Sequence, residues 1–178
     1  MPGVNPDLNA QFERLEATRG SLAARLDGRD GALLNRPRAD GGWSVLQMVH
    51  HVITAEAGTL RYTSKKMLGG TSLPWAGLTS RMRLLALKGA MVSPVRFRAP
   101  AITADVPDEV DSAETLALWQ ETREGWRKLL AGFPEELLDR MVFRHTLVGL
   151  MGLRDTLAFL QTHLDHHVRQ IDRQLGQS

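Results

Sequence analysis

Apolar side chains recur every three or four positions along the last stretch of the chain, residues 153–175, and this spacing is typical of one face of an α-helix. The repeat consists of Leu153, Leu157, Leu160, Leu164, His167 and Ile171. A half-buried strand would instead alternate every second residue. The pattern therefore predicts a long amphipathic helix that carries a histidine in a position otherwise held by aliphatic side chains.

The same periodicity predicts three more long helices upstream. The first is expected at residues 7–26. The second begins after Ser44 as N-cap and ends at the glycine pair Gly69 and Gly70. The third begins after Asp111 or Ser112 as N-cap and ends at about Leu130. No long run of residues alternates between apolar and polar side chains, as half-buried strands require. The fold class is therefore predicted to be all-α.

Four long helices, with a longer crossover between the second and the third, predict a four-helix bundle. The crossover, residues 71–110, is the least regular part of the chain, and one helical insert is expected in it at about 79–90. FPEELL is expected to form one short turn, and RHTLVGLMG a loop before the last helix. With 178 residues and 43% apolar composition, residues 1–178 are expected to form a single domain around one core.

Charge and composition narrow the classes of partner. A net charge of +2 and the absence of a recognition motif give no reason to expect nucleic-acid binding. The sequence contains neither a signal peptide nor a stretch of about 20 apolar residues. We therefore expect a cytoplasmic protein without a membrane-spanning helix. Because the chain has no cysteine, any metal ion must be bound by histidine, carboxylate or water.

Two histidines lie one turn apart on the last predicted helix. His163 and His167 are four residues apart, so both rings project from one side and can converge on one ion, whereas His166 points toward the polar side. A third ligand must come from another part of the chain. The candidates are His50 and His51 on the second helix and His145 in the loop, and helical periodicity does not separate His50 from His51 because both lie on flanks of the apolar face.

The residues GGWSVLQMVHHVITAE, followed downstream by FRHTLVGLMGLRDTLAFLQTHLDHHVRQI, resemble the DinB/YfiT-like family of metal-binding four-helix bundles. The resemblance covers most of the chain. It implies that His51, eight residues after Trp43, binds a metal ion together with His163 and His167. It also makes His50 and His166 outer neighbours of the site and implies that His145 lines it, although a loop histidine satisfied by a backbone carbonyl is an equally good interpretation of His145.

The resemblance implies a divalent Zn, Ni or Fe ion that activates either a low-molecular-weight thiol, for transfer to a small electrophile, or water, for hydrolysis. Three neutral imidazoles would leave a coordination position open for that molecule. Hydrolysis normally uses a carboxylate base near the ion. Glu56 and Asp165 are expected to face solvent or to lie behind the ligands, because neither points in the direction of its neighbouring ligand, and this slightly favours thiol transfer.

A basic region accompanies the crossover, since no Asp or Glu occurs from residue 57 to residue 104. Arg81 and Arg83 in its helical insert are candidates for attracting an anionic thiol or substrate, although a solvated basic face is the more common explanation of such a region. The insert is also apolar, which favours packing within the chain or in the homodimer that the family resemblance suggests. The four tryptophans, Trp43, Trp75, Trp119 and Trp126, are expected in the core or the site wall.

Two functions from different classes remain open at this point. One is a metal-dependent enzyme acting on a small-molecule substrate, either a thiol S-transferase or a hydrolase. The other is a non-catalytic metal-binding protein of the stress response. An enzyme should leave the ion a position facing a cavity, whereas a structural site should be closed by a fourth protein ligand.

Overall fold

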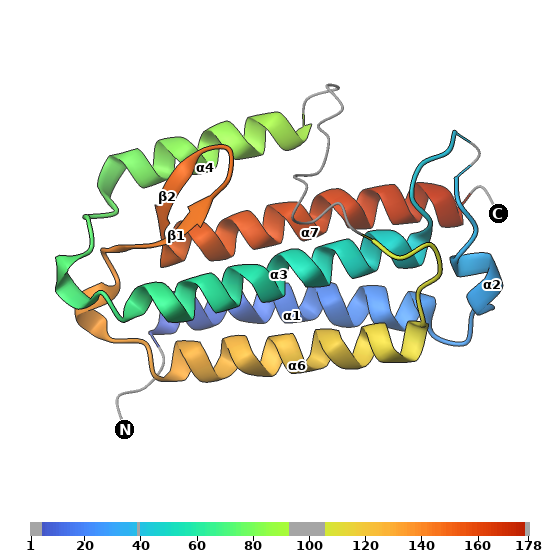
Figure 1. The fold of residues 1–178 in the computed structure, drawn as a ribbon, viewed down its shortest axis with the longest axis horizontal. Helices are drawn as coiled ribbons and strands as arrows, with labels where there is room; N and C mark the ends of the chain where they lie inside the picture. Colours follow the sequence, from blue (N-terminus) through green and yellow to red (C-terminus); the bar gives the residue numbers. More distant parts are fainter. Residues whose placement is uncertain (1–4, 39, 93–105, 177–178) are drawn as a thin grey trace.

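Four long helices lie side by side in the computed structural model, which describes residues 5–38, 40–92 and 106–176 (Figure 1). They are α1 (Pro6–Leu26), α3 (Val45–Met67), α6 (Ser112–Ala131) and α7 (Leu153–Leu175). The chain runs in one direction along α1 and α7 and in the opposite direction along α3 and α6. The predicted four-helix bundle with a long crossover between its second and third helices is confirmed.

Side-chain caps set the first residue of the second and third long helices of the chain, α3 and α6. Ser44 accepts the backbone N–H of Gln47 at 3.1 Å, and its own N–H donates to the Gln47 side chain at 2.9 Å, which completes a capping box for α3. Asp111 accepts the backbone N–H of Glu114 at 2.8 Å and so caps α6. Ser44 is thus the predicted N-cap, and Asp111 is chosen over Ser112.

The bundle core is built from the apolar faces of the four helices. Trp119 and Trp126 are fully buried in it, and Trp43 packs against its edge. Trp75, by contrast, is 65% exposed, so the prediction of a core or site-wall role is wrong for this residue. Trp75 pairs with Arg140 in an isolated β-bridge, and the Arg140 guanidinium lies 4.1 Å from the centroid of its ring.

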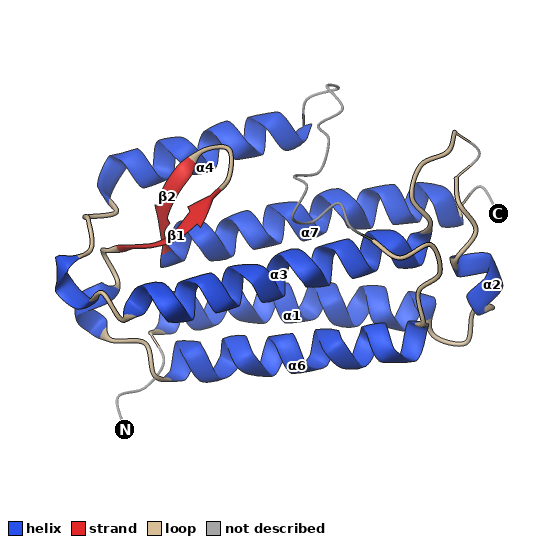
Figure 2. Cartoon of the chain, in the orientation of Figure 1, coloured by secondary structure: helices blue, strands red, loops and turns tan. Residues whose placement is uncertain are grey.

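A β-hairpin replaces the loop predicted before the last helix. Strands β1 (Met141–His145) and β2 (Gly149–Gly152) pair antiparallel, with an irregularity between Met141 and Phe143 (Figure 2). The three-residue connection ends at Gly149, whose φ of +85° is readily adopted only by glycine. Strands of five and four residues are too short to give a periodic signal, which is why the pattern did not reveal them.

The crossover packs against one side of the bundle. Helix α4 (Gly77–Val92), longer than the predicted insert, contacts α7 and β2. Short turns complete the chain at α2 (Gly31–Leu34), η1 (Gly70–Ser72) and η2 (Glu135–Leu137), the last within the predicted FPEELL turn. The rest of the crossover, residues 93–105 with their basic side chains, lies outside the described residues. None of the described helices has the length and apolar character needed to span a bilayer.

Candidate metal centre

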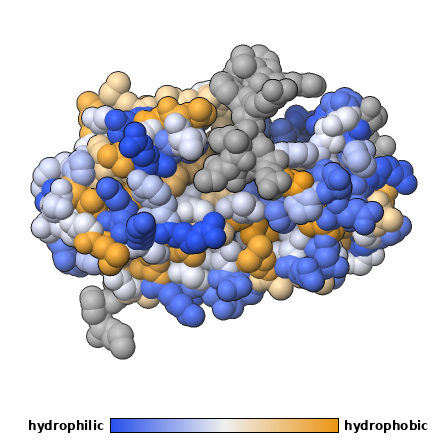
Figure 3. All heavy atoms as spheres, in the orientation of Figure 1, coloured by the Kyte–Doolittle hydropathy of each residue, from blue (hydrophilic) through white to orange (hydrophobic). Residues whose placement is uncertain are grey.

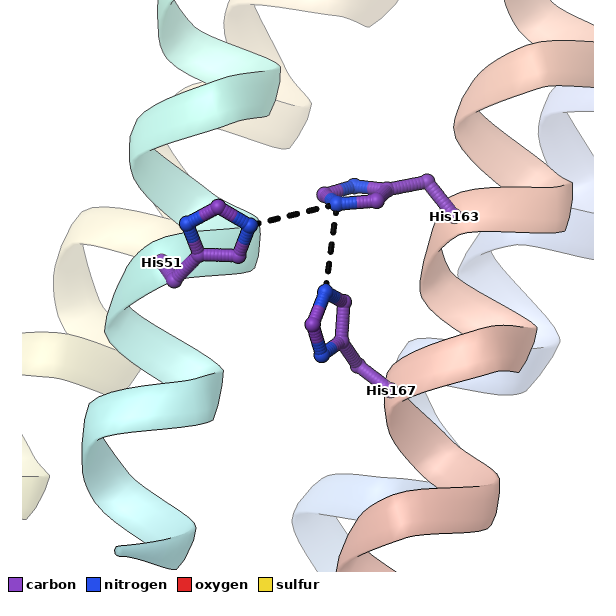
Figure 4. Close-up of side chains that lie close together, drawn as sticks. All are labelled: His51, His163 and His167. Carbon is purple, nitrogen blue, oxygen red and sulfur yellow. Dashed lines mark hydrogen bonds between the residues drawn. The ribbon is translucent and has the colours of Figure 1, made fainter. Parts of the chain in front are cut away.

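Three histidine rings from two helices converge between α3 and α7 (Figure 4). The Nε2 atom of His163 lies 3.3 Å from Nε2 of His51 and 3.2 Å from Nε2 of His167. Helix α3 supplies the first of these rings, and one turn of α7 supplies the other two. The three residues are therefore adjacent because α3 and α7 pack side by side, not because they are close in sequence.

The arrangement of nitrogens fits one divalent ion. In a tetrahedral site with metal–nitrogen bonds of about 2.0–2.1 Å, two ligand nitrogens lie about 3.3 Å apart. All three ligand atoms of the cluster lie within 4.8 Å of one another. In the part of the chain that the structure describes, no fourth His, Asp or Glu side chain belongs to this cluster. The donor set is therefore three imidazoles without a charged ligand.

The surroundings keep the imidazoles of His163 and His167 neutral. Burial, together with the neighbouring rings of His167 and His51, holds the pKa of His163 well below its usual value of 6.5. Burial and the His51 ring lower the pKa of His167 to about 3. A metal ligand must be deprotonated at its binding nitrogen. His163 and His167 are thus neutral, as ligands must be, at neutral pH.

Aromatic rings position the cluster from two sides. The Trp43 ring lies 4.8 Å from the His51 ring, and the Phe159 ring is stacked on His163 at 5.7 Å. The Nδ1 atoms of His163 and His167 are buried and have no hydrogen-bond partner among the described residues. The orientation of these two rings therefore comes from packing rather than from an acceptor behind the ring.

The other three histidines lie outside the cluster. His145, on β1, contacts Phe159 with ring centroids 4.8 Å apart, and its Nδ1 accepts the backbone N–H of Leu147 at 3.2 Å. Burial lowers the pKa of His145, so its neutral ring carries the proton on Nε2. This places His145 next to the wall of the cluster, where sequence reasoning left two interpretations open.

His50 and His166 are the outer neighbours, as expected, but His166 is half-buried rather than exposed. Its Nδ1 lies 3.0 Å from the carbonyl oxygen of Met91 in α4, and its Nε2 lies 3.1 Å from the Gln170 amide. The reason is that α4 packs along α7 and covers this side of the helix. His166 thus connects the helix that carries two of the three clustered histidines to the crossover.

Glu56 does not face solvent, which was one of the two positions expected for it. Its carboxylate is buried and accepts hydrogen bonds from Trp119 and Arg123 of α6. Asp165 is half-buried and accepts the Gln161 amide at 2.8 Å. Neither carboxylate belongs to the histidine cluster.

Arg81 and Arg83 lie on different sides of α4. Arg81 is exposed, whereas Arg83 donates to the carbonyl oxygen of Leu150 at 2.5 Å and packs against Gly149. The Arg83 guanidinium therefore holds the hairpin against α4. A role of these two residues in attracting anions stays a prediction.

The model of the DinB superfamily matches residues 14–171, a range that includes all three clustered histidines. No curated protein shows a significant match to the chain.

Solved structures share the fold. One is YfiT from Bacillus subtilis, described as "a probable metal-dependent hydrolase with an unusual four-helix bundle topology", with a TM-score of 0.59, 20% identity and coverage of 99% of this chain and 92% of YfiT. Another is TT2238, described as a four-helix bundle protein, with a TM-score of 0.53, 20% identity and coverage of 96% of this chain and 99% of TT2238. At this level of identity the likeness concerns the fold.

Proposed function

The chain belongs to the DinB superfamily, and we propose that it is a metal-dependent enzyme whose divalent ion is held by His51, His163 and His167. The observation that carries the proposal is the convergence of three imidazole rings, whose ligand nitrogens lie within 4.8 Å of one another. Two of the distances between these nitrogens, 3.3 and 3.2 Å, match the spacing of ligands to one ion. Zn, Ni and Fe in their divalent states all suit such a donor set. An ion bound by neutral ligands keeps its full charge and lowers the pKa of a thiol or water molecule at its open position.

A cluster of three histidines, which no fourth His, Asp or Glu of the described residues joins, favours an enzyme over a non-catalytic metal-binding stress protein. Structural zinc sites are closed by four protein ligands, whereas catalytic sites keep one position for a reactant. Every histidine of the chain lies in the described part, and His50, His145 and His166 stand outside the cluster. The chain has no cysteine that could close the site. A non-catalytic role would require a fourth ligand from elsewhere.

The chain's own residues would enclose the reacting atoms. Trp43 packs against the His51 ring and Phe159 against the His163 ring, where both would shield the imidazoles from water. His145 offers an Nε2–H donor near Phe159, which suits hydrogen bonding to a leaving group or an oxygen of the substrate. We therefore assign His145 to the lining of the site, with a role in orienting the substrate.

Thiol transfer is the favoured reaction, and hydrolysis is the second candidate. Among the described residues, no carboxylate belongs to the cluster as a general base for water, since Glu56 points to α6 and Asp165 accepts a hydrogen bond from Gln161. A thiol has a much lower pKa than water and does not need such a base once a nearby positive charge favours the thiolate. The description of YfiT as a probable metal-dependent hydrolase supports the second candidate.

One pair of assays separates the two reactions. The protein is reloaded with zinc, nickel or iron and tested with a thiol plus 1-chloro-2,4-dinitrobenzene, and separately with a p-nitrophenyl ester in the absence of thiol. We expect metal-dependent formation of the thioether, lost in His163→Ala and retained in His50→Ala. Ester hydrolysis that depends on the ion, without any thiol transfer, would reverse the order of the two candidates.

We also propose that the protein is a homodimer that pairs through α4. Leu78, Met82 and Leu85 are exposed and share one side of this helix, and Figure 3 shows apolar surface gathered over α4 at the upper left. The stripe is nearly symmetric about Met82, so an antiparallel pair would place Leu78 against Leu85 of the other copy. Light scattering should report a dimer for the wild type and a monomer for Met82→Glu. A wild-type monomer at high concentration would contradict the pairing.

A further inference from the structure

A groove of about 390 Å³ lies beside the last two turns of α7, at the end of the bundle where α3 begins. Its other wall is the segment between α2 and α3. Three arginines line it, Arg36, Arg38 and Arg173, against one acidic side chain, Asp40. Apolar side chains such as Leu33 and Val45 complete the walls. A concave surface that combines cationic groups with apolar walls concentrates the electric field on a bound anion.

Two of the three guanidinium groups are available to a ligand. Arg38 forms an ion pair with Asp40 at 2.9 Å, and this pair cancels one positive charge. Arg36 and Arg173 have no ion-pair partner within residues 5–38, 40–92 and 106–176. Both side chains are exposed to solvent and line the groove. The groove therefore keeps two positive charges from two separate segments of the chain.

The wall that carries Arg36 is fixed before any ligand arrives. The Arg36 carbonyl oxygen accepts the Gln174 amide of α7 at 3.2 Å. The preceding residue, Asn35, donates to the carbonyl of Val110 and accepts its N–H, both at 3.0 Å. A binding surface that is already ordered loses less entropy when it binds.

The groove begins one turn from the histidine cluster. Gln170 lines the groove, and its amide lies 3.1 Å from Nε2 of His166, next to the clustered His167. Arg173 follows His167 by six residues on the same helix, a rise of about 9 Å at about 1.5 Å per residue. This rise is within the length of one small molecule.

We propose that this groove binds the anionic end, a carboxylate or phosphate, of the molecule whose other end reacts at the histidine cluster. The substrate or thiol cosubstrate is then a small anion whose charged group lies on the order of 10 Å from its reacting atom. Arginine suits this role because its planar guanidinium can bind carboxylate or phosphate at two points. That the other end of this molecule reacts at the cluster rests on the proposed function. Anion binding in the groove does not require a metal ion at the cluster.

The first test uses metal-free protein, so that it decides the groove independently of the proposed function. Tricarballylate and inorganic phosphate are titrated calorimetrically at low ionic strength into the wild type, the double variant Arg36→Gln/Arg173→Gln, and Arg14→Gln. Arg14 is an exposed arginine of α1 outside the groove and serves as the matched control. We expect at least tenfold weaker binding in the double variant and no change in Arg14→Gln.

The two probes distinguish the sources of the charge. Tighter binding of tricarballylate indicates a carboxylate ligand, and tighter binding of phosphate indicates a phosphorylated one. Equal binding by the wild type and the double variant, or no binding of either probe at millimolar concentration, would overturn the inference.

The second test connects the groove to the cluster. Cobalt-loaded protein is titrated with glutathione and with its dimethyl ester, which has the same thiol but no free carboxylate, and thiol binding is followed by visible absorption. The wild type should prefer the free acid about tenfold, and the double variant should lose this preference while its cobalt content stays unchanged. An undiminished preference in the double variant would overturn the connection. Failure of every variant to hold cobalt would instead contradict the proposed function and leave the first test valid.

Discussion

The Glu56 carboxylate and the Arg123 guanidinium form a buried two-point ion pair between α3 and α6. Oε1 of Glu56 lies 2.8 Å from Nη2 of Arg123, and Oε2 lies 2.9 Å from Nε. Burial raises the pKa of Glu56, and the positive charge of Arg123 limits that rise. Helix α3 thus presents His51 to α7 and Glu56 to α6. The only acidic side chain of this helix is used to join two helices and is turned away from the histidines.

Replacing one member of this pair should destabilise the fold strongly. Glu56→Ala leaves the Arg123 charge buried without its main partner, and we expect a loss of about 3–5 kcal/mol in the free energy of unfolding, measured by urea denaturation. Arg154→Gln, which removes only exposed ion pairs with Asp7 and Asp139, should cost less than about 1 kcal/mol. A similar small effect for both variants would contradict a structural role of the buried pair.

The close contact between the N-cap of α7 and the start of α4 can be tested with a pair of glycines. A Cβ at Gly152 would lie 2.7 Å from the Cβ of Ala76, so Gly152→Ala should destabilise the protein by about 1–3 kcal/mol. Gly20 lies within α1, where an added Cβ would have no atom of the surrounding structure within 4 Å, so Gly20→Ala should stabilise the protein by about 0.5–1 kcal/mol. Thermal unfolding should show a lower midpoint for Gly152→Ala and a higher midpoint for Gly20→Ala than for the wild type. Shifts of both midpoints in the same direction would be inconsistent with this packing.

Stability of the metal-free protein should depend on pH through the buried imidazoles. The pKa values of His163 and His167 are lowered on folding, so below about pH 6.5 the unfolded chain binds protons that the folded chain does not. The free energy of unfolding should therefore fall as the pH drops from 6.5 toward 3, by up to about 1.4 kcal/mol per pH unit for each such histidine. Denaturant midpoints between pH 7.5 and 5.5 measure this slope. His167→Gln should flatten it, and an unchanged slope would show that the ring is not held neutral.

Substitution of Arg83 should lower the stability of the fold much more than substitution of Arg81. Arg83→Gln removes a charged hydrogen bond to the hairpin at Leu150, and a loss of about 1–2 kcal/mol in the free energy of unfolding is expected. Arg81→Gln changes an exposed side chain and should stay within about 0.5 kcal/mol. If Arg81→Gln raised the KM of an anionic substrate without affecting stability, the attraction of anions predicted from the basic region would be supported.

The helices could be predicted from the sequence because their signals are local. The apolar repeat of residues 153–175 and the capping residues Ser44 and Asp111 lie within single helices, and the structure confirms each of them. The hairpin gave no such signal, since its strands are short and lack an Asn-Gly turn. The glycine at position 149, after a three-residue connection, was the available indication.

The candidate site could be predicted only in part, because only some of its residues are brought together by local structure. The i, i+4 spacing of His163 and His167 places both on one side of a helix, whereas the choice between His50 and His51 depends on which helix packs against which. Family resemblance supplied that choice, and the structure places His51 in the cluster. The pairing of Glu56 with Arg123 and the exposure of Trp75 depend on contacts between distant segments, which no local pattern encodes.

The measurement that tests the central claim most directly is the metal content of protein purified without an affinity tag, determined by mass spectrometry for the wild type, His163→Ala and His50→Ala. We predict close to one Zn, Ni or Fe ion per chain in the wild type and in His50→Ala, and its loss in His163→Ala. The absence of bound ion from the wild type, even after reloading with each of the three metals, would contradict the assignment of the cluster as a metal centre.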